Sequence, residues 1–419
     1  MQVMVVGGGI GGLSLALSLH QAGIAVRIYE SVRDPAPLGV GINLQPSAVR
    51  ELIELGLGDD LAQAGIATQH LSYFNKRGQL IWTERRGLRA GYKWPQYSIH
   101  RGQLQMLLLR AVQKRVGRGN FRSGLRLTTF EQGQSRVTAT FTDTQSGRVV
   151  SDEADILVGA DGIHSTVRRC LYPAEGAPRF ARQILWRAAV DTEPFLDGQT
   201  MAIAGHFHQR IIAYPIGPGA TAGNLLTNWI CQISVPGEAP PREDWNRHVA
   251  KETVLTAFGQ WRLPWLDIPA LIERTPQIYE FPLVDRDPVH AWTFGRVTLI
   301  GDAAHPMQPT GAQAGSQAVI DARALTAALL GASSPFQALK RYEGERRPIM
   351  SDITLRNRQF GPEAALQLVE ERAPDGFSRI DDVISREELE AISSSFSTAA
   401  GLDVEAVNGR PSFVPLARS

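Results

Sequence analysis

The stretch that decides the fold stands at the start of the chain, as Gln2-Val3-Met4-Val5-Val6-Gly7-Gly8-Gly9-Ile10-Gly11-Gly12. Residues 2–6 predict a short buried strand, residues 10–22 a packed helix of small apolar residues, and residues 25–30 a second strand. The glycines at 7, 9 and 12 match the pattern G-x-G-x-x-G between the first strand and the helix. The sequence therefore predicts a βαβ unit that binds a dinucleotide.

Each glycine of this pattern has its own task. Gly7 permits the tight turn, Gly9 lets the backbone approach a pyrophosphate, and Gly12 lets the helix pack on the strand. The amides at the start of the helix then face the anion.

Glu30 ends the second strand, where a carboxylate accepts the hydroxyls of an adenosine ribose and disfavours a 2′-phosphate. The pocket is therefore expected to hold FAD or NAD rather than NADP. The alternative is a plain βαβ unit with Glu30 on its surface.

The rest of the chain predicts a discontinuous α/β fold. A length of 419 residues favours two domains. Further buried strands are expected at 154–160 and 296–302, and short β-rich runs at 184–190, 201–205, 210–216 and 225–233 indicate a separate antiparallel sheet. The prediction is a Rossmann-like domain for FAD or NAD, formed by 1–72, 97–178 and 283–350, with an inserted antiparallel domain of 73–96 and 179–282 for the substrate and C-terminal helices within 351–419.

Composition excludes several classes of protein. A formal net charge of +1 argues against a nucleic-acid partner. Cys170 and Cys231 are too few for a disulfide scaffold or a thiolate metal site, and a cytoplasmic location without a metal or a membrane is expected. No apolar stretch approaches the roughly 20 residues that span a bilayer. The C-terminal helices could pack on the flavin domain or form a dimer contact, so monomer and homodimer both stay open.

Two later segments indicate which dinucleotide binds. They are Gly159-Ala160-Asp161-Gly162-Ile163-His164-Ser165-Thr166-Val167-Arg168 and Gly301-Asp302-Ala303-Ala304-His305-Pro306, which continues to Pro309-Thr310-Gly311-Ala312. With the first motif, they make the chain resemble the flavoprotein aromatic hydroxylases, the single-component monooxygenases typified by p-hydroxybenzoate hydroxylase, from residue 1 to about residue 350. The resemblance implies that Asp161 contributes to FAD and nicotinamide binding, that Asp302 holds the ribityl chain, and that Arg101 reaches the FAD phosphates.

The resemblance also assigns residues around the flavin ring. Pro309 matches the proline beside the reacting face, and Gly41 belongs to a loop along the flavin edge, where glycine permits close approach. The family usually carries Gly-Gln-Gly-x-Asn where this chain has Ala312-Gln313-Ala314-Gly315-Ser316. We expect the backbone amides of Gly315 and Ser316 to point at the flavin pyrimidine and to stabilise negative charge there.

The chemistry that the resemblance implies is carried by the flavin, so no protein group is assigned as catalytic. NADH or NADPH reduces FAD, molecular oxygen gives a C4a-hydroperoxide, and an aromatic ring takes up one oxygen atom. His305 is expected to be a structural part of its loop.

Three further stretches lie outside the general motifs, at 37–43, 95–102 and 284–288. They resemble the phenazine-modifying hydroxylases of the family. This implies an aromatic or N-heteroaromatic substrate, and it leaves open whether the ring carries a carboxylate and whether hydroxylation removes it.

Aromatic residues of the inserted sheet are candidates for substrate contact. Trp186, Tyr214 and Trp229 fall on three successive predicted strands, where flat rings suit a flat substrate; the alternative is that they are core residues. The candidates for a substrate carboxylate are Arg187, His206, His208 and Arg210. Trp186 and Arg187 are neighbours on a strand and should face opposite ways, so without a bulge they cannot both line one pocket.

Two other functions compete with hydroxylation. One is a non-hydroxylating flavoprotein, either a reductase or a binding scaffold. The other is a flavin halogenase, which the segment Trp265-Leu266-Asp267-Ile268-Pro269 disfavours because it lacks the first tryptophan of the halogenase motif.

Overall fold

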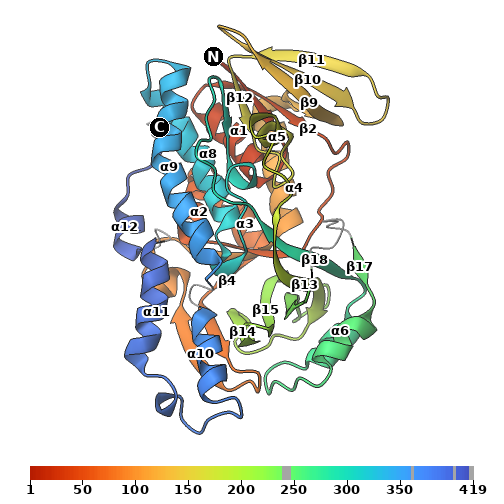
Figure 1. Ribbon diagram of the computed structural model, residues 1–419, viewed down its shortest axis with the longest axis vertical. Coiled ribbons are helices and arrows are strands. Elements are labelled where there is room, and N and C mark those ends of the chain that lie inside the picture. Colours follow the sequence, from red (N-terminus) through yellow and green to blue (C-terminus); the bar gives the residue numbers. More distant parts are fainter. Residues whose placement is uncertain (238–246, 360–362, 400–402, 415–419) are drawn as a thin grey trace.

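The computed structural model describes residues 1–237, 247–359, 363–399 and 403–414. A parallel sheet with its helices lies at one end of the molecule and a larger sheet at the other (Figure 1). This is the α/β architecture with an added antiparallel sheet that the sequence predicts.

The parallel sheet has five strands in the order β19-β12-β1-β2-β8. Its strands are β1 (Gln2–Val6), β2 (Ala25–Glu30), β8 (Phe121–Ser123), β12 (Ile156–Gly159) and β19 (Val297–Leu299). β1 lies between β2 and β12, and its Val3, Met4 and Val5 are fully buried. A central parallel strand is covered on both faces, so it needs a continuous apolar run rather than an alternating one.

Helices cover this sheet. The helix α1 (Ile10–Gln21) follows β1 as predicted and packs against α8 (Ala314–Gly331) and α4 (Arg101–Val112). α8 in turn packs against α9 (Pro335–Asn357) and α2 (Pro46–Glu54). α9 runs past the predicted domain boundary at 350. The other helices of this half are α3 (Gly58–Ala64) and α5 (Thr166–Leu171).

Two three-stranded sheets complete this half. One consists of β3 (Gly41–Leu44), β7 (Gln96–His100) and β4 (Gly65–Thr68). The other consists of β9 (Leu125–Gln132), β10 (Val137–Asp143) and β11 (Val149–Ala154).

The larger sheet has eight strands in the order β17-β18-β13-β16-β15-β14-β5-β6. They are β5 (His70–Phe74), β6 (Leu80–Arg85), β13 (Arg179–Thr192), β14 (Thr200–His206), β15 (Gln209–Pro218), β16 (Leu225–Ser234), β17 (His248–Val249) and β18 (Ile278–Asp285). Neighbouring strands are antiparallel except for β14 and β5. The four predicted β-rich runs lie within β13 to β16. β5 begins slightly before the predicted boundary at 73, and the domain boundaries themselves stay a prediction.

One face of this sheet is closed by α6 (Lys251–Phe258) and α7 (Ile268–Arg274), whose Val254, Phe258 and Leu271 join a buried cluster with it. The opposite face contributes to a second buried cluster with residues of the C-terminal helices, among them Leu366 and Leu389, and part of the same face lines a cavity. The site therefore shares its sheet face with a core.

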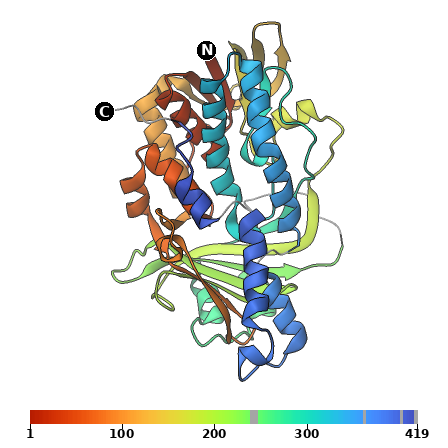
Figure 2. The same ribbon diagram turned by 90° about the vertical axis from the view of Figure 1, so that its left-hand side faces the viewer.

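The C-terminal part of the chain adds α10 (Ala364–Arg372), α11 (Arg386–Ala399) and α12 (Val404–Gly409). α10 packs on β14, and its buried residues cluster with those on one face of the large sheet, across which the blue C-terminal helices lie in Figure 2. Ser385 accepts a hydrogen bond from the amide of Glu388 (3.2 Å), which caps the start of α11. Among the helices that the structure describes, none combines the length and the apolar character needed to cross a bilayer.

Candidate functional site

Two cavities contain most of the predicted site residues. The first is a cleft of about 640 Å³ beside the glycine-rich turn, and its lining includes Gly7, Gly9, Glu30, Arg101 and Asp161. The second, of about 170 Å³, lies against the large sheet, and its lining includes Gly41, Tyr214, Pro309 and Gly315.

The loop after β2 links the two cavities. It passes from Leu38, in the lining of the first, to Gly41, in the lining of the second. Gly12, Asp302 and Ser316 line neither cavity.

The glycines of the turn differ in what surrounds them. Gly7 has φ +110°, and a Cβ there would lie 2.3 Å from the Ala160 carbonyl oxygen. A Cβ on Gly12 would lie 2.1 Å from the Gly7 carbonyl oxygen. A Cβ on Gly9 would meet nothing within 4 Å. Gly7 and Gly12 are thus required by packing, whereas Gly9 leaves a stretch of backbone open to a ligand, as a pyrophosphate site needs.

Glu30 is oriented at the rim of the same cleft. Its carboxylate accepts hydrogen bonds from the amides of Gly8 (2.7 Å) and Val32 (2.7 Å). The Ser31 hydroxyl donates a third hydrogen bond (3.1 Å), so about one of the four acceptor positions of the carboxylate remains for a ribose hydroxyl. The open Gly9 backbone and the fixed acceptor at Glu30 together fit the adenosine diphosphate part of FAD.

Asp161 organises the segment after β12. Its carboxylate accepts from the Ser165 hydroxyl (2.5 Å) and from the amides of Thr166 (2.7 Å) and Val167 (3.2 Å) at the start of α5. Burial raises its pKa, and these hydrogen bonds lower it. The side chain therefore shapes the loop that lines the cleft, in a way that the motif alone did not reveal.

A buried ionic cluster supports the turn that carries Asp302. Asp321 of α8 accepts from the amide of Gly301 (3.0 Å), from the Nε2 of His305 (2.5 Å) and from the Nε of Arg346 (2.8 Å). Burial raises the pKa of Asp321, but the charges of His305 and Arg346 outweigh it and bring the pKa down to about 2. His305 is buried within this cluster, in the structural role that the sequence predicts.

Asp302 is accessible to solvent in its turn, although protein atoms crowd its carboxylate. This partial loss of water raises the pKa of Asp302, while the nearby charges of His305 and Arg101 lower it. Its carboxylate is thus close to Arg101, which lines the first cleft.

The loop before α8 carries the departure from the family pattern. Ala312 has φ +53°, a left-handed conformation that favours glycine. The Ser316 hydroxyl accepts from the amide of Gln45 (2.9 Å), which ties the helix start to β3. The amide of Gln317 donates to the Gln313 carbonyl (2.9 Å) as the first bond of the helix, so the amides of Gly315 and Ser316 precede it.

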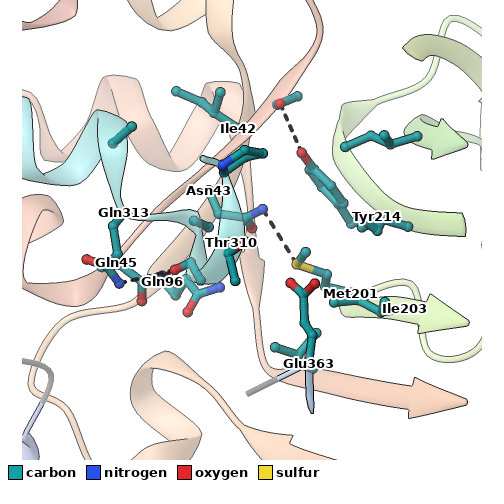
Figure 3. A pocket seen from close by; sticks show the side chains of 18 of the residues that line it. Ile42, Asn43, Gln45, Gln96, Met201, Ile203, Tyr214, Thr310, Gln313 and Glu363 are labelled. Carbon is teal, nitrogen blue, oxygen red and sulfur yellow. Dashed lines mark hydrogen bonds between the residues drawn. The ribbon is translucent and has the colours of Figure 1, made fainter. Parts of the chain in front are cut away.

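Strand alternation decides which residues of the large sheet reach the second cavity. On β15 the lining residues are Arg210, Ile212 and Tyr214, every second residue. Across the sheet Ile212 is opposite Ile230, which is opposite Arg187. Figure 3 shows Tyr214, Met201 and Ile203 projecting from the strands toward Asn43 and Thr310. The cavity face thus has an apolar middle and polar ends.

Trp186 and Trp229 do not line this cavity, which corrects the expectation from the sequence. Trp229 is paired with Ala213, the neighbour of Tyr214, so it lies on the opposite face. Its Nε1 donates to the Thr275 hydroxyl (3.0 Å), and the Nε1 of Trp186 donates to Glu280 (2.9 Å). Both rings belong to the core beneath α6 and α7.

The peptide of Gly41 is held by three strands of the large sheet. Its carbonyl accepts from the Tyr214 hydroxyl (2.9 Å) and from the guanidinium of Arg187 (2.9 Å), and its amide donates to Asn228 (2.8 Å). A Cβ on Gly41 would lie 2.7 Å from Ile216, so only glycine fits. Burial lowers the pKa of Arg187 and raises that of Tyr214.

Sequence reasoning missed most polar residues of the second cavity. Arg86 is paired with Glu84, and Arg210 with Glu363. Burial raises the pKa of Glu363, whereas the charge of Arg210 lowers it. Of the four candidate carboxylate-binding residues, Arg187 and Arg210 line the cavity and His206 and His208 do not.

Several buried polar atoms of the cavity have no hydrogen-bond partner among the described residues. They are Glu84 Oε1, Gln96 Oε1 and Arg187 Nε, whereas Tyr73 and Arg86 interact with each other. Buried polar atoms are normally satisfied, so this mixture of donors and acceptors indicates a cavity built for a polar ligand.

Comparisons with known proteins identify the family of the chain. A family model described as an FAD binding domain matches residues 1–357. The phenazine 1,6-dicarboxylic acid hydroxylase PhzS of Lysobacter antibioticus is 45% identical over 361 residues, which cover 85% of this chain and 89% of that protein.

Solved structures share the fold. A salicylate hydroxylase substrate complex superposes with a TM-score of 0.75 at 22% identity, covering 98% of this chain and 97% of the other. HpxO of Klebsiella pneumoniae, complexed with FAD and uric acid, gives a TM-score of 0.73 at 24% identity, covering 98% and 95%. The chain therefore belongs to this FAD-binding family and is a FAD-dependent aromatic hydroxylase with the p-hydroxybenzoate hydroxylase-like fold.

Proposed function

We propose that this enzyme hydroxylates a flat, fused N-heteroaromatic ring that carries a carboxylate, using NADH or NADPH and molecular oxygen. The observation that carries the proposal is the second cavity, which combines an apolar middle with Arg187, a half-buried cation without an acidic partner among the described residues. The relative from Lysobacter antibioticus is named for a phenazine dicarboxylic acid, which supports the fused N-heteroaromatic class of ring but does not fix the number of carboxylates.

The residues of the first cleft hold FAD in this proposal. The open backbone at Gly9 takes the pyrophosphate, Glu30 a ribose hydroxyl and Arg101 the phosphate charge. Gly7 and Gly12 keep the turn in shape, and Asp161 keeps the neighbouring loop in shape. Asp302, close to Arg101, accepts from the ribityl hydroxyls.

The second cavity presents the substrate to the ring of the cofactor. When bound and reduced by NAD(P)H, the flavin supplies the activation of oxygen. Pro309 closes one side of the cavity, and the amides of Gly315 and Ser316 stabilise negative charge at the start of α8. Arg187 binds the substrate carboxylate, and Tyr214 donates to a polar group of the ring or to Gly41.

The apolar middle of the cavity excludes water from the ring. Its side chains are Leu71, Leu185, Ile203, Ile212 and Ile230. These residues bury the faces of a flat ring between the large sheet and the loop 309–315. Keeping water out protects the oxygen-transfer step from unproductive decay.

The test is oxidation of NADH and NADPH by the purified enzyme with phenazine, quinoline and hydroxybenzoate carboxylates, with hydrogen peroxide measured in parallel. We expect fast, coupled oxidation for a fused N-heteroaromatic carboxylate, with a product one oxygen heavier. A product that has instead gained a hydroxyl and lost carbon dioxide would identify decarboxylative hydroxylation. Oxidation that yields only hydrogen peroxide with every compound would contradict the proposal.

Arg187→Gln provides the matched variant. It should weaken binding of the carboxylated ring by about 10- to 100-fold, because a charge-assisted hydrogen bond is lost. Binding of the same ring with a neutral carboxamide should change much less. Equal losses for both compounds would show that Arg187 does not bind the carboxylate.

A further inference from the structure

One wall of the second cavity comes from outside the part of the chain that the family model matches. Glu363 and Ser393 both line the cavity, whereas the match ends at residue 357. Glu363 stands directly before α10, whose Ala365, Leu366 and Val369 are buried in one cluster with Leu71 and Tyr73 of the large sheet. Packing of α10 therefore fixes the position of Glu363.

Glu363 is paired with Arg210 inside the cavity. The two side chains are only 7% and 5% exposed, so the pair is largely shielded from water. Figure 3 shows the carboxylate of Glu363 directed toward Met201 and Ile203 in the lining of the cavity. A carboxylate in such a place disfavours a second negative charge close by.

Arg210 does not depend on Glu363 alone for its position. Its Nε and one terminal nitrogen donate to the Oε1 of Gln232 (3.1 and 3.0 Å). Gln232 in turn donates to Gln183 (2.6 Å), which donates to the Phe207 carbonyl (3.1 Å). This chain of hydrogen bonds would hold the guanidinium in place if Glu363 lost its charge.

The charges that line the cavity do not balance. Arg86, Arg187 and Arg210 are opposed by Glu84 and Glu363. Arg86 pairs with Glu84 and Arg210 with Glu363, which leaves Arg187 without an acidic partner among the described residues. One substrate carboxylate neutralises this excess, whereas a second would face Glu363 or would have to displace it from Arg210.

We propose that Glu363 is a specificity residue that restricts this enzyme to ring substrates with a single carboxylate. Its carboxylate repels a second carboxylate of the substrate, and its ion pair with Arg210 keeps that guanidinium from binding one. The inference rests on the proposed function, because it assumes that a carboxylated ring occupies this cavity. Glu363→Gln keeps the size of the side chain and one acceptor oxygen for Arg210 but removes the charge. This variant should therefore admit dicarboxylates.

The experiment measures binding rather than turnover. Oxidised, FAD-loaded wild type and E363Q are titrated with phenazine-1-carboxylate and phenazine-1,6-dicarboxylate, and Kd is read from the change in flavin absorbance. We expect the wild type to bind the monocarboxylate at least about tenfold more tightly, and E363Q to reduce that ratio at least about tenfold through tighter binding of the dicarboxylate. Equal binding of both compounds by the wild type, or an unchanged ratio in E363Q, would overturn the inference.

Two control variants separate charge from structure. Glu363→Asp keeps the charge and should keep the discrimination, so loss of discrimination in both variants would point to a disturbed wall and would contradict the proposal. Glu370→Gln removes a carboxylate of the same helix that pairs with Lys76 and does not line the cavity, and it should leave both Kd values unchanged.

The outcomes also separate this inference from the proposed function. If neither compound binds to the FAD-loaded wild type, phenazine acids are not its ligands and the inference fails, while the proposed function is still decided by the quinoline carboxylates of its own test. If the monocarboxylate binds without discrimination, only the role of Glu363 is wrong.

Discussion

The FAD cleft and the substrate cavity are built on different principles. In the cleft the constraint acts on the backbone, because a Cβ at Gly7 or Gly12 would come within 2.3 Å of a carbonyl oxygen. In the cavity the constraint acts on side chains such as Arg187 and Tyr214, whose direction depends on strand register. A constraint on the backbone allows only certain residue types and so produces a recognisable sequence motif, whereas a constraint on side chains can be met by many sequences. The cleft is therefore the part by which the family is recognised, and the cavity is the part that determines which substrate binds.

The largest expected effect comes from substitutions in the glycine-rich turn, which test whether a glycine is needed for packing or for approach of the cofactor. Gly12→Ala forces a Cβ against the Gly7 carbonyl oxygen and should lower the free energy of unfolding of the apoprotein by about 3 kcal/mol. Gly9→Ala meets nothing within 4 Å, so stability should change by less than about 0.5 kcal/mol while FAD affinity falls. Urea denaturation and FAD titration measure the two effects. Equal stabilities of the two variants would refute the distinction between packing and ligand approach.

The polar groups of the cleft give the next largest effect. Asp302→Ala and Glu30→Ala should each weaken FAD binding by about 1.5–3 kcal/mol, because each removes charged acceptors of hydrogen bonds. The fold should persist, so far-ultraviolet circular dichroism should be unchanged while flavin is lost on gel filtration. Asp375→Ala, at an exposed site, is the control. Full flavin content in the Asp302 variant would rule out its assigned role.

The ionic cluster behind the turn predicts a pH dependence. The pKa of Asp321 is lowered from 3.8 to about 2, so its contribution to stability is complete above pH 3.8 and is lost as the pH falls toward 2. The shift corresponds to about 2 kcal/mol. Asp321→Asn should therefore melt at a lower temperature than the wild type near neutral pH, and the gap should narrow on acidification. Thermal unfolding of the apoprotein at several pH values measures it, and a gap that stays constant would contradict the assignment.

The two faces of the large sheet can be compared directly. Trp186→Phe removes a hydrogen bond to Glu280 in the core and should cost about 1 kcal/mol of stability without changing the affinity for a ring carboxylate. Tyr214→Phe removes a hydrogen bond to Gly41 in the cavity and should cost a similar amount but also change that affinity. Melting temperature and ligand titration separate the two effects. A Trp186 variant with altered ligand affinity would show that the faces are not independent.

The smallest effect concerns the loop before α8. Ala312 has φ +53°, so Ala312→Gly relieves strain and should raise the free energy of unfolding by about 0.5 kcal/mol. Ala314→Gly, within the first turn of α8, should lower it by a similar amount because glycine weakens a helix. Thermal unfolding of both variants measures these changes in stability. A loss of stability in both variants would mean that the left-handed conformation of Ala312 carries no strain.

The sequence predicts the FAD cleft better than the substrate cavity, because the cleft depends on local backbone constraints and the cavity on side chains from distant strands. The βαβ unit, the glycine pattern and Glu30 are local in sequence, and the structure has them where they were expected. Trp186 and Trp229 were assigned to the wrong face, because alternation fixes relative directions within a strand but not which face meets the cavity. Glu363 was missed altogether, since its meeting with Arg210 joins positions 153 residues apart and no motif marks it.

The peptide of Gly41 connects the substrate cavity with the FAD cleft. Its carbonyl takes hydrogen bonds from Arg187 and Tyr214, which line the substrate cavity, and its loop continues to Leu38, which lines the cofactor cleft. A ligand that draws either donor away from Gly41 changes the free energy of that loop. Reciprocity then requires that FAD alter the affinity for such a ligand by the same factor as the ligand alters the affinity for FAD. The affinity for FAD and the affinity for such a ligand are therefore linked, and a change in one implies an equal change in the other.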